Sequence, residues 1–131
     1  MLNLNGTTLQ QVADKALLDA AAHPRWIVAI GRALVELDTN PYLERQADHL
    51  LIGSPSGATY AANGQCSCTA FIHSQPCWHR AASRLVRLHD EREAQAAQLA
   101  DKVIEVVDQT RIARKIAAAR AAVQFNAELF A

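Results

Sequence analysis

The sequence predicts a mostly helical α+β fold, and two observations carry that prediction. All five glycines lie at or before Gly64 and all four prolines at or before Pro76, so the alanine-containing stretch that follows holds no helix breaker. Upstream of it, two short apolar runs joined by a turn rich in Pro, Gly and Ser are typical of a β-hairpin. Half of the residues are apolar and few are aromatic, which agrees with a helix-rich chain.

Two helices are predicted before the hairpin. The first begins at the N-cap candidate Thr8 and ends near Ala22, because the residue before a proline disfavours helical backbone. The second begins after Pro24, which suits a first helical turn, and ends within 38–41. Its apolar stripe consists of Trp26, Ile30, Ala33, Leu34 and Leu37.

The hairpin strands are predicted at 48–53 and 58–62, and a further helix is predicted to begin near Cys77. This order places Cys66 shortly after the second strand and Cys77 at a helix N-terminus. Because the first N–H groups of a helix lack intrahelical partners, we expect them to favour a thiolate at Cys77.

The apolar residues of the long C-terminal segment change face along its length. One stripe contains Leu85, Leu88, Ala96, Leu99, Val103 and Val106, and a second contains Ile112, Ile116, Ala119, Val123 and Phe130. At 100° per residue the second stripe lies nearly opposite the first, which predicts a break or kink within 108–110. The second stripe either folds back onto the core or contacts another copy or another protein; the helix-contact candidates are Ile112, Ile116, Val123 and Phe130.

The only cysteines of the chain stand in two short motifs, Cys66-Ser67-Cys68 and Cys77-Trp78-His79. In extended backbone, side chains two residues apart point the same way, so each pair offers two donors to one face. Zinc takes four nitrogen or sulfur ligands in a tetrahedron, and three cysteines with one histidine form a common structural site. The sequence therefore predicts Zn²⁺ bound by Cys66, Cys68, Cys77 and His79.

Two alternatives compete with this site. The three thiols could instead form one disulfide and one free cysteine, but the N-terminal residues show no secretory signal, and an odd cysteine count favours metal chemistry. His73 is a rival ligand; the one-residue spacing favours His79, and we expect His73 to be a solvent-facing loop residue. We expect a cytoplasmic protein.

The pattern Cys-x-Cys, eight residues, Cys-x-His resembles the SWIM-type zinc finger. A strand bearing Tyr60 before the first pair and an aromatic, Phe71, after it agree with that family. Trp78 stands where the family usually has a basic residue. The resemblance spans about a third of the chain and implies a zinc-bound hairpin plus helix, with DNA or protein binding as its role.

The sequence divides into an N-terminal helical pair (1–41), a SWIM-like finger (42–88) and a C-terminal helical extension (89–131), which we expect to form one compact unit with the finger. The formal net charge of zero excludes a histone-like basic binder. No run is apolar enough to span a membrane. Because no phosphate loop or nucleophile–base pair is present, we expect no enzymatic activity.

Two functions remain open. The first is DNA binding, since three arginines repeat on one face of the helix that leaves the motif and a second basic segment follows. The candidate residues are Trp78, Arg80, Arg84, Arg87, Arg111, Arg114, Lys115 and Arg120. The alternative is a protein-interaction adaptor or accessory subunit, in which the C-terminal helices contact a partner or a second copy.

Overall fold

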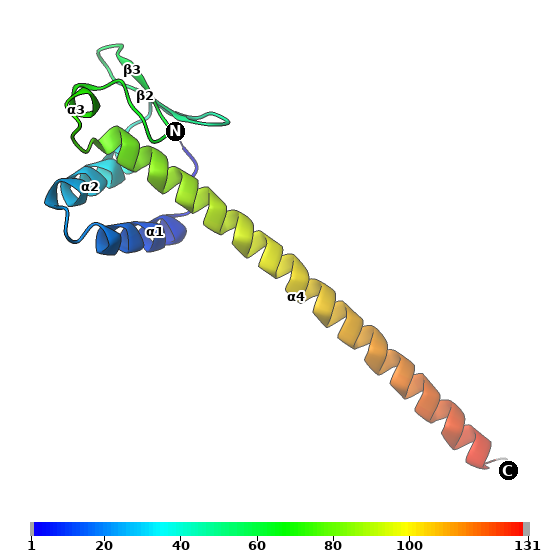
Figure 1. Cartoon of the computed structure of the whole chain (residues 1–131). Coiled ribbons are helices and arrows are strands. Elements are labelled where there is room, and N and C mark those ends of the chain that lie inside the picture. Colours follow the sequence, from blue (N-terminus) through cyan, green and yellow to red (C-terminus); the bar gives the residue numbers. More distant parts are fainter. Residues whose placement is uncertain (1, 130–131) are drawn as a thin grey trace. The chain divides into compact units, whose positions relative to one another are not determined.

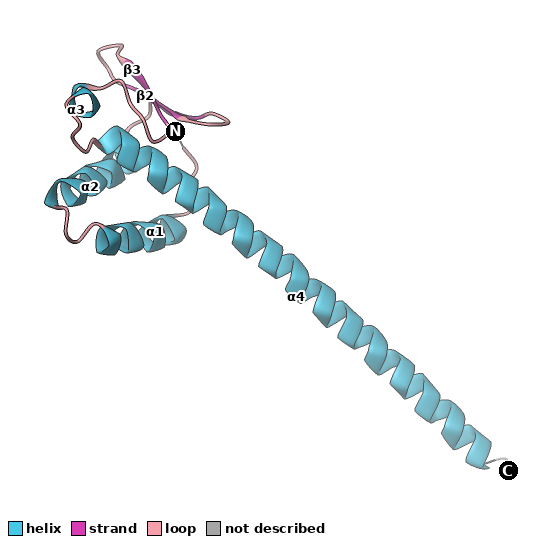
Figure 2. Ribbon diagram, viewed as in Figure 1, coloured by secondary structure: helices cyan, strands magenta, loops and turns pink. Residues whose placement is uncertain are grey.

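The computed structural model describes residues 2–129, and the side chains of 2–123. Its internal contacts divide the chain into two units, Met1–Glu93 and Ala94–Ala131, which are described separately. The elements are mostly helices, with one small antiparallel sheet in the first unit (Figure 1), as Figure 2 shows by secondary structure. The predicted mostly helical α+β class is thereby confirmed. None of the helices in the described part combines the length and the apolar character that a membrane crossing needs. The division at 41/42 and 88/89 stays a prediction.

Two helices open the first unit, as predicted. Helix α1 spans Gly6–Asp19, and its N-cap is Asn5 rather than Thr8, because the Asn5 side-chain oxygen accepts from the backbone N–H groups of Thr7 and Thr8. Helix α2 spans Pro24–Thr39, with the proline in its first turn.

The sheet has three strands in the order β1-β2-β3, all antiparallel. Strands β2 (Leu50–Gly53) and β3 (Thr59–Ala62) form the predicted hairpin. Strand β1 (Leu43–Arg45) was not predicted; it has three residues, only one of them buried, and therefore shows no alternating pattern. Ile52 stands opposite both Leu43 and Tyr60 in the register.

A short helix, α3 (Thr69–Ile72), lies between the two ligand pairs and was also not predicted. Helix α4 spans Trp78–Leu129 and begins where expected. The predicted break within 108–110 is wrong, since α4 is uninterrupted there. The Thr110 hydroxyl donates to the carbonyl of Val106 one turn earlier, so it supports the existing helix instead of capping a new one. Phe130 lies outside the described residues.

The hydrophobic core of the first unit is shared by α1, α2, the sheet and the early turns of α4. Its largest fully buried side chains are Ile52 from β2 and Leu85 from α4. Many of the other core side chains are small. Ala13 of α1, Ala33 of α2 and Ala82 of α4 are each fully buried. Buried alanines allow close helix approach but contribute little apolar area each, so this core is compact rather than large.

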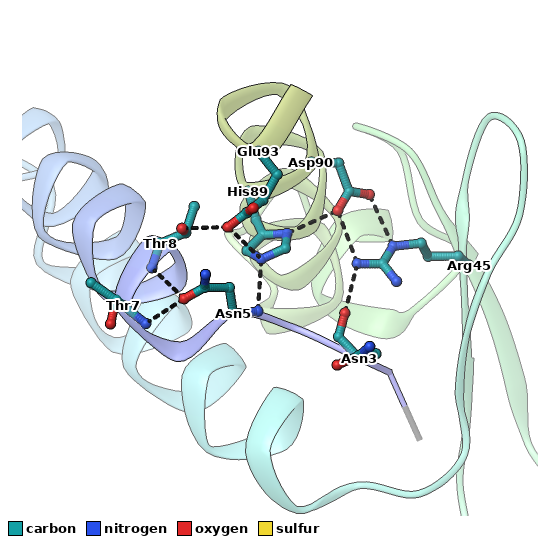
Figure 3. A network of polar contacts seen from close by, with 8 residues as sticks. All are labelled: Asn3, Asn5, Thr7, Thr8, Arg45, His89, Asp90 and Glu93. Carbon is teal, nitrogen blue, oxygen red and sulfur yellow. Dashed lines mark hydrogen bonds and ion pairs between the residues drawn. The ribbon is translucent and has the colours of Figure 1, made fainter. Parts of the chain in front are cut away.

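A polar network ties the start of the chain to α4 (Figure 3). The backbone N–H of Asn5 donates to Nε2 of the buried His89, whose Nδ1 contacts Asp90 over 2.9 Å. Beside them, the Thr8 hydroxyl donates to the carboxylate of Glu93. The N-terminal segment is thus held against α4 by directional bonds.

The same network reaches the sheet. Arg45 of β1 donates two hydrogen bonds to the two carboxylate oxygens of Asp90, each 2.9 Å long. The Nη2 atom of Arg45 also donates a hydrogen bond to the backbone carbonyl of Asn3. One arginine therefore connects the sheet, α4 and the N-terminal segment.

Candidate metal centre

The fold brings the four predicted ligands together. The ligand atoms of Cys66, Cys68, Cys77 and His79 all lie within 4.8 Å of one another; the cysteines are buried and the histidine is half-buried. All three thiols are free, so the disulfide alternative does not apply to this arrangement. This group could hold a metal ion.

The donor chemistry fits zinc. Nδ1 of His79 lies 3.6 Å from Sγ of Cys66. Zinc bond lengths of about 2.3 Å to sulfur and about 2.0 Å to nitrogen at tetrahedral angles separate such a pair by about 3.6 Å. The ring nitrogen that faces the thiols is therefore Nδ1, at a spacing that an ion could bridge without a large rearrangement.

Local structure explains where each ligand sits. Cys66 follows β3 after a tight turn at Gly64, whose φ of 109° favours glycine. Cys68 is the N-cap of α3, Cys77 directly precedes α4, and His79 lies in the first turn of α4. A strand end and two helix starts thus converge on one point.

The three thiols are not electrostatically equivalent. Burial raises the pKa of the Cys66 thiol to about 12. Burial also raises the pKa of Cys77, and the donor from the Arg80 backbone only partly offsets it. For Cys68, burial is outweighed by backbone N–H groups of Phe71 and Ala70 and by the two other thiols, so its pKa is lowered.

The α4 start favours a thiolate at Cys77, as expected, because the Arg80 N–H lowers the pKa of this thiol, but burial outweighs that effect. The helix start whose thiol has a lowered pKa is that of α3, which the sequence did not reveal, and the thiol concerned is Cys68. At Cys77, the loss of hydration on burial exceeds the effect of the α4 start.

His79 contacts two aromatic rings. The centroid of Tyr60 lies 4.6 Å from that of His79, and the centroid of Trp78 lies 4.3 Å from it on the chain-neighbour side. Burial lowers the pKa of His79, and the positive charge of Arg32 lowers it further. Both effects favour the neutral imidazole, which is the form that binds a metal.

Two cation–π contacts cross between α2 and the start of α4. The guanidinium of Arg80 lies 5.2 Å from the Trp26 ring centroid and 5.1 Å from that of Phe71, while its Nε donates to the carbonyl of Gly64. In the opposite direction, Arg32 of α2 lies 5.5 Å from the ring of Trp78. Each helix therefore offers an arginine to a tryptophan of the other.

These contacts give Trp78 and Arg80, two of the predicted nucleic-acid residues, partners within the first unit. Trp78 is half-buried between His79 and Arg32, and Arg80 is half-buried with its guanidinium already bonded. Sequence reasoning had no signal for Arg32 or for the double stacking of Arg80, because these contacts join residues nine or more positions apart in the chain.

The remaining predicted basic residues are exposed. Arg84 and Arg87 line a groove of about 500 Å³ in the first unit, which is also lined by Arg45 and by three carboxylates, Asp48, Asp90 and Glu91. Arg111, Arg114, Lys115 and Arg120 are exposed on α4 in the second unit. The helix-contact candidates Ile112, Ile116 and Val123 are exposed as well.

A second groove, of about 610 Å³, borders the centre itself. Cys68, Cys77 and His79 form part of its wall, which gives an ion a path to the site. His73 caps the end of α3, is exposed, and is not part of the four-residue group, as expected of a loop residue.

No family model, curated protein or solved structure matches this chain. The resemblance to a zinc-finger family therefore rests on the sequence motif alone. What the fold establishes is a buried group of three cysteines and one histidine that could hold a metal ion, with zinc as the metal that fits.

Proposed function

We propose that this chain is a non-enzymatic SWIM-type protein in which a structural zinc ion orders the first unit and α4 supplies a contact surface for a protein partner. The zinc would be held by Cys66, Cys68, Cys77 and His79. Four protein ligands leave no position for a substrate or a water, so such an ion has a structural role.

The size of the first unit supports that role. Its core contains many alanines and few large side chains, and the segment from β2 to the start of α4 has no large apolar cluster of its own apart from the cysteines, which pack with Tyr60, Ala70 and Phe71. Structural zinc contributes roughly 10–16 kcal/mol in small fingers, which is comparable to the whole net stability of a domain.

The observation that carries the adaptor proposal is the exposure of apolar side chains in the second unit. Single exposed apolar residues are ordinary on a protein surface. Here, every Leu, Ile and Val of residues 94–123 is exposed, and a helix with no core of its own must bury such side chains elsewhere. These residues are Leu99, Val103, Ile104, Val106, Val107, Ile112, Ile116 and Val123.

Native mass spectrometry of the purified chain tests this proposal, because it reads metal content and stoichiometry together. We expect one zinc per chain. A folded chain that holds no metal would overturn the zinc centre. A metal-loaded chain whose solubility and associations are unchanged by α4 substitutions at Leu99 and Val103, two exposed apolar residues, would overturn the contact role.

A second candidate function, DNA binding, is favoured by the placement of two groups of basic side chains. Arg84 and Arg87 are exposed on one groove wall, and the segment 111–120 carries four basic side chains and no carboxylate. It ranks second because Asp48, Asp90 and Glu91 line the same groove, and their charges oppose a polyanion.

A salt titration separates the two functions. Phosphate contacts weaken steeply between low and physiological salt because counterions are released on binding, whereas an apolar helix contact does not. The double variant Arg84→Ala/Arg87→Ala should abolish DNA binding with zinc retained. Unchanged affinity in that variant would exclude this groove as the DNA surface.

A further inference from the structure

One continuous apolar seam runs along α4 in the second unit. Its members follow one another at alternating steps of three and four residues, the spacing of a coiled coil, over three heptads. At 100° per residue they fall within an arc of about 100°. They are Ala96, Leu99, Val103, Val106, Thr110, Ala113 and Ala117, and all are exposed.

The seam changes in side-chain size halfway along. After Ala96, its first half presents the large side chains Leu99, Val103 and Val106, whereas its second half presents threonine and alanine. A parallel pair of such helices would set large against large at one end and alanine against alanine at the other. An antiparallel pair sets large against small throughout, which keeps the helices at one separation and leaves no void.

Charge follows the same division. Residues 94–108 carry the carboxylates Asp101, Glu105 and Asp108 against a single lysine, whereas residues 109–123 carry four basic side chains and no carboxylate. In a parallel pair, the two basic halves would lie side by side and repel. In an antiparallel pair, each basic half lies along an acidic half.

We infer that residues 99–117 pair antiparallel with the same residues of a second copy of this chain. Leu99 then lies level with Ala117 of the second copy, Val103 with Ala113, and Val106 with Thr110. The contact is isologous, so it closes as a dimer. The inference rests on the proposed contact role of α4 and names its partner as the chain itself.

Two matched substitutions test the seam in the full, zinc-loaded chain. Val103 and Ile112 have similar exposure, 55% and 58%, but lie nine residues apart and therefore on opposite sides of the helix. Light scattering should give a dimer for the wild type and for Ile112→Glu. Val103→Glu should raise the dimer dissociation constant by about a hundredfold or more, because it places a charge in the apolar seam.

A monomeric wild type would overturn the pairing, as would a dimer that Val103→Glu leaves intact. Zinc content, measured on the same samples, separates this failure from failure of the proposed function. A monomer with one zinc per chain refutes the self-pairing alone, and a chain without zinc refutes the metal centre. Circular dichroism of Val103→Glu confirms that the first unit is still folded.

A distance measurement tests the orientation. A spin label placed at Gln95 through an unnatural amino acid leaves the ligand thiols unmodified. In the antiparallel register, the two labels are 26 residues apart along the axis, or about 39 Å. In a parallel pair they would be separated by about one interhelical distance, ~10 Å. The short distance would overturn the inference.

Discussion

The backbone N–H of Asn5 donates to Nε2 of His89 over 3.0 Å, across 84 positions of the chain. Nε2 must therefore be an acceptor, which leaves the ring proton on Nδ1, where it is donated to Asp90. An imidazolium has no acceptor nitrogen, so this contact exists only with the neutral ring. One buried histidine thus fixes where the N-terminal segment lies against α4.

This geometry predicts the tautomer of His89. At neutral pH, nitrogen-15 NMR should show Nδ1 protonated and Nε2 bare. His89→Phe leaves the Asn5 N–H without its partner and should cost about 1–3 kcal/mol of unfolding free energy. His89→Gln, which can still accept from Asn5, should cost less. Equal costs for the two variants would show that packing, rather than the hydrogen bond, is what the histidine contributes.

The Arg45–Asp90 pair predicts a dependence of stability on pH. Burial alone would raise the pKa of Asp90, but hydrogen bonds from Arg45 and His89 outweigh it and hold this pKa below its ordinary value. The ionised carboxylate therefore stabilises the fold fully above about pH 4, and this contribution is lost as the pH falls through the lower folded pKa.

Urea denaturation of the wild type and Asp90→Asn between pH 3 and 7 tests this dependence. The wild type should be more stable near neutrality and the difference should vanish on acidification. Because the Asp90 side chain is 44% exposed, the difference should not exceed about 1 kcal/mol. A difference that grows toward low pH would contradict the assignment.

Zinc binding should release protons. Cys66, with a pKa of about 12, and Cys77, with a raised pKa, are both protonated at pH 7, whereas Cys68 has a lowered pKa. We therefore expect about two to three protons per zinc at pH 7, and an affinity that falls as the pH falls. Calorimetry in buffers of different ionisation enthalpy measures this number; a value near zero would mean that the thiols are not the ligands.

Removing one ligand should unfold the region 50–88. Cys68→Ser or His79→Ala breaks the four-ligand set, and the lost zinc contribution of roughly 10 kcal/mol or more exceeds what this small core can replace. Native mass spectrometry and far-ultraviolet circular dichroism report the metal and the fold. His73→Ala, which changes an exposed histidine in the same loop, is the matched control and should retain both.

Arg80 and Arg84 should differ in their effect on stability. Arg80→Ala loses two stacking contacts and the bond to the Gly64 carbonyl, and should cost about 1–3 kcal/mol. Arg84→Ala removes an exposed side chain and should change the unfolding free energy by less than about 0.5 kcal/mol. If thermal and urea denaturation showed equal losses of stability for the two variants, the stacking and hydrogen bond of Arg80 would not contribute to stability as we expect.

The elements that the sequence predicted well are those with a local signal. Pro24 marks the start of α2, the turn before Thr59 separates the hairpin strands, and the cysteine spacing marks the ligand group. Each of these signals can be read from residues that lie close together in the sequence. The antiparallel pairing of β2 and β3 and the convergence of the four ligands follow from these signals.

What could not be predicted depends on distant partners or on competing local effects. Strand β1 exists because Leu43 pairs with Ile52, and α3 is too short to show periodicity. Thr110 looked like a cap, yet its hydroxyl bonds within the continuing helix. Arg80, a predicted DNA-binding residue, makes cation–π contacts with rings from two other elements, and sequence spacing does not reveal such contacts.

Both tryptophans of the chain lie in the first unit, and one of them is next to a predicted ligand. Trp78 neighbours His79, and Trp26 lies beneath the Arg80 guanidinium. The tryptophan fluorescence of the unlabelled protein therefore reports on the surroundings of His79 and Arg80, and residues 94–131 contribute no tryptophan to it. A change in tryptophan emission on adding a chelator would therefore report release of the ion in real time, without any label on the protein.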